Sequence, residues 1–107
     1  SNAGALDMQL VVDFYIGIDQ DAELACDLVR QVAAIGRYTY LSKPIVVLAK
    51  QVVQDNCVGL QIRLKAYFLD THYEKQFETD VTLRVLEAFR EHDIQPPAGL
   101  HRQQVTD

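Results

Sequence analysis

A chain of 107 residues with 49% hydrophobic residues is long enough for one domain with a core, and this composition argues against intrinsic disorder. Its formal net charge is −5, and its ten basic residues are scattered along the sequence, which argues against binding to a nucleic acid backbone. No apolar run approaches the roughly 20 residues that span a bilayer, and no signal-peptide pattern opens the sequence.

Three segments are expected along the chain. Residues 1–3, Ser-Asn-Ala, resemble the remnant of an expression tag. Residues 4–99 are expected to form the single domain, and residues 100–107 a flexible tail. Because no initiating methionine precedes the first predicted strand, we expect the chain to be a fragment of a larger protein.

Alternating hydrophobicity predicts the first strand over residues 8–18. The even positions are apolar throughout, so one face of this strand is expected to lie against a core. The other face is not wholly polar, because it carries Val11 and Tyr15.

A helix is predicted over residues 20–35. Asp19 is expected to cap it, and Gly36 can adopt the left-handed conformation that ends a helix. An apolar stripe at helical spacing is expected to face the core: Ala25, Leu28, Val29, Val32 and Ile35.

Residues 44–69 predict a β-hairpin. Asp55 and Asn56 tolerate the positive φ angles of a two-residue turn, and pairing outward from them sets Val53 opposite Val58. This register gathers the apolar side chains of both strands on one face: Ile45, Val47, Ala49 and Val53 from the first, and Val58, Leu60, Ile62, Leu64, Ala66 and Phe68 from the second.

The opposite face of the first hairpin strand is also apolar, with only Lys50 interrupting it. Exposed apolar rows of this kind often contact a partner protein. The candidate subunit interface comprises six residues: Val11, Tyr15, Val46, Leu48, Val52 and Tyr67. The alternative interpretation is that these six residues are ordinary surface residues or are covered by the tail.

Thr71 and Glu74 have the spacing of a capping box, which predicts a second helix that ends near His92. A short strand is expected at Ile94, and a β-bulge at Gly59. The order β-α-β-β-α(-β) predicts an α+β fold: a two-layer ferredoxin-like sandwich with an antiparallel sheet and two helices on one face.

No set of side chains that would form a catalytic or metal site is evident. The three histidines fall at a helix start, a helix end and the tail, and the acidic residues 19–23 are explained by helix capping. Cys26 and Cys57 lie on different elements without ligand spacing, so both are expected to be small apolar fillers in a reducing compartment. We expect no catalytic residues, no cofactor and no enzymatic activity.

Several runs together resemble the carboxy-terminal α/β domain of the small-conductance mechanosensitive channel (MscS-like) family. They are VVDFYIGIDQDAELACDLVRQV at 11–32, Pro44 with the hairpin run VGLQIRLKAY, residues 73–89, and the closing HDIQPPAGL. The similarity covers nearly all of residues 8–99.

The resemblance implies a domain on the cytoplasmic side of the bacterial inner membrane, in a channel whose transmembrane helices and central β domain precede residue 4. Copies of the domain would form part of a heptameric cage, through which ions and small osmolytes pass during osmotic downshock. Two alternatives remain: a ferredoxin-like regulatory module that binds small molecules, and a stand-alone enzyme, which would need a convergent polar pocket.

Overall fold

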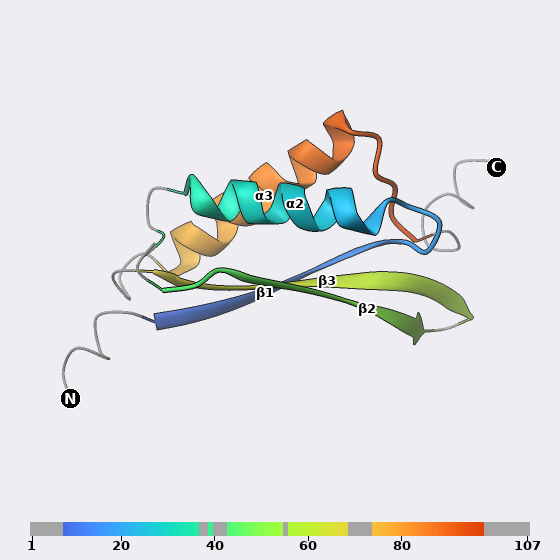
Figure 1. The fold of residues 1–107 in the computed structure, drawn as a ribbon, viewed down its shortest axis with the longest axis horizontal. Coiled ribbons are helices and arrows are strands. Elements are labelled where there is room, and N and C mark those ends of the chain that lie inside the picture. Colours follow the sequence, from blue (N-terminus) through green and yellow to red (C-terminus); the bar gives the residue numbers. More distant parts are fainter. Residues whose placement is uncertain (1–7, 37–38, 40–42, 55, 69–73, 98–107) are drawn as a thin grey trace.

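The fold has two layers, a sheet and a pair of helices on one of its faces (Figure 1). A computed structural model describes residues 8–36, 39, 43–54, 56–68 and 74–97. The elements are β1 (Met8–Gly17), α2 (Ala22–Ala34), β2 (Val46–Gln54), β3 (Cys57–Phe68) and α3 (Glu74–Glu91). The strands form one sheet in the order β1-β3-β2, and both pairings are antiparallel. The expected α+β class with an antiparallel sheet is confirmed.

The predicted hairpin register is confirmed. Val53 lies opposite Val58, and Val47 lies opposite Leu64. Asn56 has a φ of 64°, as a tight hairpin turn requires, while Asp55 lies outside the described residues. Because β1 and β2 both run antiparallel to β3, they are parallel to each other, and α2 connects them.

The core lies between the sheet and the helices. Alternate side chains of β1 and β3 are buried against apolar side chains of α2 and α3. Two aromatic pairs join the layers: Phe14 contacts Phe89 edge to face at 6.1 Å between ring centroids, and Phe68 stacks on Phe77 at 5.6 Å. Such pairs contribute about 0.5–1.5 kcal/mol each beyond the burial of their area.

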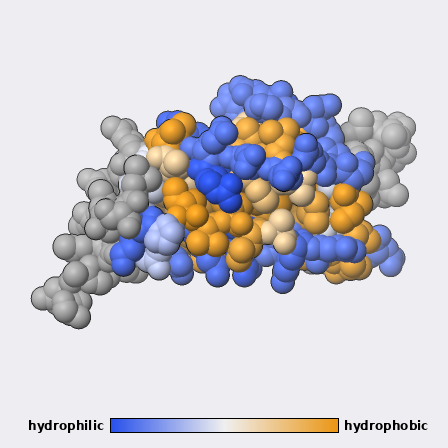
Figure 2. Space-filling view, viewed as in Figure 1, coloured by the Kyte–Doolittle hydropathy of each residue, from blue (hydrophilic) through white to orange (hydrophobic). Residues whose placement is uncertain are grey.

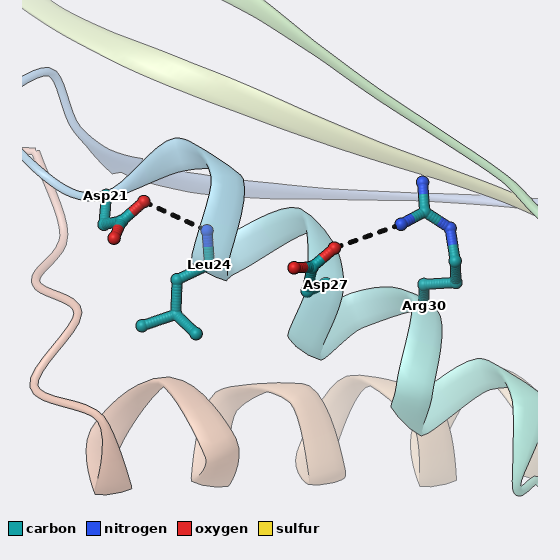
Figure 3. Close-up of polar contacts among 4 residues, drawn as sticks. All are labelled: Asp21, Leu24, Asp27 and Arg30. Atoms are coloured by element: carbon teal, nitrogen blue, oxygen red, sulfur yellow. Dashed lines mark hydrogen bonds and ion pairs between the residues drawn. The ribbon is translucent and has the colours of Figure 1, made fainter.

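The cap of the first helix is Asp21, so the prediction of Asp19 is wrong. The backbone N–H of Leu24 donates to Asp21 Oδ1 at 3.1 Å (Figure 3). A turn closed by the hydrogen bond from Gln20 N to Gly17 O precedes the cap, and Asp19 accepts from the side chain of Gln20. The turn between strand and helix therefore shifts the helix start two residues along the chain.

The second helix begins at Glu74 and ends at Glu91, close to the predicted end. Its expected cap, Thr71, lies outside the described residues. Ile35, expected in the buried stripe of the first helix, is instead its exposed C-cap residue.

Gly59 does not form the expected bulge. The pairing of β3 with β2 runs through Gly59 without an extra residue, and Gly59 also forms the last pair with β1, opposite Gly17. A Cβ atom at this position would lie 3.0 Å from both Ile16 O and Pro97 Cγ. The glycine therefore allows close approach of the residues that follow α3.

Ile94 does not form the expected strand either, and it belongs to no helix or strand in the described part of the chain. Asp93 adopts a φ of 59° and ends α3, and Ile94 N donates to Phe89 O at 2.8 Å. The side chain of Ile94 is buried, and Gly17 N donates to Gln95 O at 2.9 Å. This segment closes one end of the core as irregular backbone.

Three residues expected on the buried face of the hairpin, Ala49, Val53 and Val58, are exposed, with Val53 at 68%. The 13 residues of α2 span about 20 Å, whereas the 12 residues of β3 span about 40 Å, so this helix covers only part of the strand. Figure 2 shows apolar surface at the level where helices and sheet meet.

Candidate functional site

The six residues of the predicted interface share the sheet face that lies opposite the helices, which we call the open face. The pairing places Val11 and Tyr15 of β1 on it, together with the even positions of β2 and the odd positions of β3. Four of the six are well exposed: Val11 at 42%, Tyr15 at 49%, Val46 at 37% and Leu48 at 49%. Val52 and Tyr67 are partly buried.

The register divides the apolar residues of the open face into two stripes. Lys65 of β3 lies between Val11 of β1 and Val46 of β2. One row further along the sheet, Arg63 lies between Asp13 and Leu48. Except for Tyr67 of β3, the six interface residues therefore lie on the two outer strands, on either side of the polar residues of the central strand.

An ion pair fixes the middle of the open face. Arg63 Nε donates to Asp13 Oδ1 at 2.8 Å, and a second guanidinium nitrogen donates to Asp13 Oδ2 at 3.1 Å. The hydrogen bond from Arg63 holds the pKa of Asp13 below its usual value, and the same contact raises the pKa of Arg63. Sequence reasoning missed this pair, because it depends on the register between two strands 50 residues apart.

A neighbouring row adds a second polar group. Gln61 lies between Tyr15 and Lys50, and it is buried although it faces away from the helices. Its side chain also helps to lower the pKa of Asp13. A shallow hollow of about 310 Å³ lies beside it, lined by Leu48, Ala49, Lys50, Gln61 and Arg63.

Tyr67, at the other end of the central strand, contacts residues of its own chain. Lys43 Nζ lies 5.5 Å from the centroid of its ring, and Gln9 Nε2 donates to its hydroxyl at 3.5 Å. Tyr67 is therefore less available to a partner than the valines and leucine of the outer strands.

A second hollow, of about 340 Å³, lies along the outer edge of β1. Side chains from three parts of the chain line it: Tyr15 and Ile16 from β1, Leu86, Phe89 and Arg90 from α3, and Asp93, Ile94, Gln95 and Pro96. Apolar walls and charged rim residues of this kind suit a small amphipathic molecule.

The residue types that bind metals or act as nucleophiles are spread over the described ranges. In them, no three His, Cys, Asp or Glu side chains are grouped so as to hold a metal ion. Both cysteines are partly buried, and burial raises the pKa of the Cys26 thiol, which disfavours its reactive thiolate. His92 lies beside Ala88 O at 3.0 Å, whereas His72 and His101 lie outside the described residues.

None of the helices in the described part of the chain is long and apolar enough to cross a membrane. Neither a comparison with protein-family models nor a comparison with curated proteins gives a match for this chain.

Proposed function

We propose that this chain is a non-enzymatic domain of an MscS-like channel, and that it forms part of the oligomeric cage through which ions and small osmolytes pass. The observation that carries the proposal is the open face, where Val11, Tyr15, Val46 and Leu48 remain exposed on a sheet covered by helices only on its other side. A neighbouring subunit in a ring would cover these side chains.

We further propose that the fold is ferredoxin-like. The strand order β1-β3-β2, with α2 connecting the parallel outer strands, is compatible with that topology. The described residues contain three of the four strands that the topology has in its complete form. The resemblance of residues 8–99 to the MscS-like family supports the same assignment.

The proposal is tested in a full-length protein that carries the upstream segments. In membrane patches it should conduct under suction, and it should rescue a channel-deficient bacterial strain from osmotic downshock. A Leu48→Lys substitution on the open face should reduce rescue, whereas Gln31→Lys on the outer side of α2 should not. A well-expressed full-length protein without conductance or rescue would contradict the proposal.

The hollow along β1 favours a second candidate function, a regulatory module that binds a small molecule. Its volume of about 340 Å³ is within the range of ligand pockets, and Arg90 and Asp93 among its lining residues suit a molecule that carries both an anionic and a cationic group. A thermal-shift screen with amino acids and nucleotides should then give a stabilising ligand whose effect is lost in Arg90→Ala. No stabilisation across the panel would contradict this candidate.

A further inference from the structure

Charge is separated between the two layers of the domain. The strands of the open face carry three basic residues, Lys50, Arg63 and Lys65, against one acidic residue, Asp13, a net charge of +2. Helices α2 and α3 carry seven acidic residues against four basic ones, a net charge of −3. The open face is thus basic in a chain whose total charge is −5.

The outer side of α3 also has exposed apolar residues. Leu83 is 62% exposed and Leu86 46% exposed. Glu87 follows Leu83 by four residues, so the two share a side of the helix, and Glu91 follows one turn later. Arg90 follows Leu86 by four residues, so this side of α3 combines apolar groups with two acidic residues and one basic residue, whereas the open face combines apolar groups with a net positive charge.

These charges discriminate between the ways in which two copies can meet. A symmetric contact between two open faces would bring +2 against +2, and a symmetric contact between two helix layers would bring −3 against −3. Only a head-to-tail contact, open face against helix layer, brings opposite charges together. Head-to-tail contacts repeat from copy to copy and form a ring when the rotation between neighbours closes.

We propose that the open face of one copy binds the outer side of α3 in the next copy. Lys50 and Lys65 face the acidic residues Glu87 and Glu91, while the apolar outer strands cover Leu83 and Leu86. This inference rests on the proposed cage function and adds to it the identity of the two surfaces that meet.

A charge-swap experiment on the chain itself tests the contact. Sedimentation equilibrium up to about 1 mM should detect self-association of the wild-type chain that weakens with added salt. The open-face variant K50E/K65E and the α3 variant E87K/E91K should each weaken association by about tenfold or more, because each brings like charges together. An equimolar mixture of the two variants should restore association, since each contact between unlike variants again joins opposite charges.

The single variant Lys50→Glu has a matched control in Arg30→Glu on α2, which changes the charge by the same amount outside the proposed contact and should leave self-association unchanged. Thermal unfolding checks that each variant is folded. The inference would be overturned if the wild-type chain did not associate at about 1 mM. It would also be overturned if K50E/K65E associated as strongly as the wild-type chain, or if the mixture of the two variants did not associate. If a full-length protein nevertheless conducts under suction, the cage function stands and only the choice of contact surfaces is wrong.

Discussion

Asp13 on β1 and Arg63 on β3 are joined by two hydrogen bonds, of 2.8 and 3.1 Å, across the middle of the open face. The pair neutralises one basic residue of the central strand and leaves Lys50 and Lys65 to give the face its net positive charge. It also fixes the guanidinium in place between the two apolar stripes. The open face is consequently a patterned surface, with a polar centre and apolar sides.

The pair makes a pH-dependent contribution to stability. Because the folded-state pKa of Asp13 lies below the unfolded value of 3.8, the contribution is present above pH 3.8 and disappears as the pH falls through the folded-state pKa. Asp13→Asn should therefore lower the free energy of unfolding at pH 7, by less than about 1 kcal/mol because both side chains are partly exposed. Urea unfolding at pH 7 and at about pH 2.5 measures the difference.

Asp27→Asn provides the control, because Asp27 pairs with Arg30 at 3.3 Å on an exposed helix surface and should show a smaller effect (Figure 3). A destabilisation by Asp13→Asn that is as large at low pH as at pH 7 would contradict the assigned role of the ion pair.

Gly59→Ala should destabilise the domain by about 1–3 kcal/mol, because the added methyl group would meet Ile16 O and Pro97 Cγ at 3.0 Å. Combining it with Pro97→Gly should cost less than the sum of the two single substitutions, since the second change removes one of the clashing groups. Urea unfolding of the four proteins gives the interaction energy. Strict additivity would show that the close approach of Pro97 is not what requires a glycine.

Asp21→Ala should cost about 1 kcal/mol of stability, because it leaves the N–H of Leu24 without its capping acceptor. Asp19→Ala should cost less, since Asp19 accepts from a side chain in the preceding turn and not from the helix backbone. Thermal unfolding of the two variants ranks them. A larger loss for Asp19→Ala would contradict the assignment of the cap.

Local signals predicted most of the fold. The hairpin register followed from Asn56 and the alternation on each side of it, because a short turn fixes which residues face each other. The helix cap was misplaced by two residues, because Asp19 and Asp21 are chemically equivalent and only the turn after Gly17 distinguishes them.

Features that depend on distant contacts were not predictable in this way. The role of Gly59 depends on the position of Pro97, and the exposure of Val53 depends on where the helices end. The six interface residues were placed on one face from the sequence, but the division of five of them into two stripes, on β1 and β2, became evident only from the pairing of both strands with β3.

The central claim, that a neighbouring subunit covers the open face, is tested most directly by the reactivity of a cysteine placed there. In a full-length background with Cys26→Ala and Cys57→Ser, a Leu48→Cys variant should react with a maleimide much more slowly in the assembled oligomer than in the isolated chain at a concentration low enough to keep it monomeric. A Gln31→Cys variant on α2 should react equally in both. Equal reactivity at position 48 in the oligomer and in the isolated chain would contradict the claim.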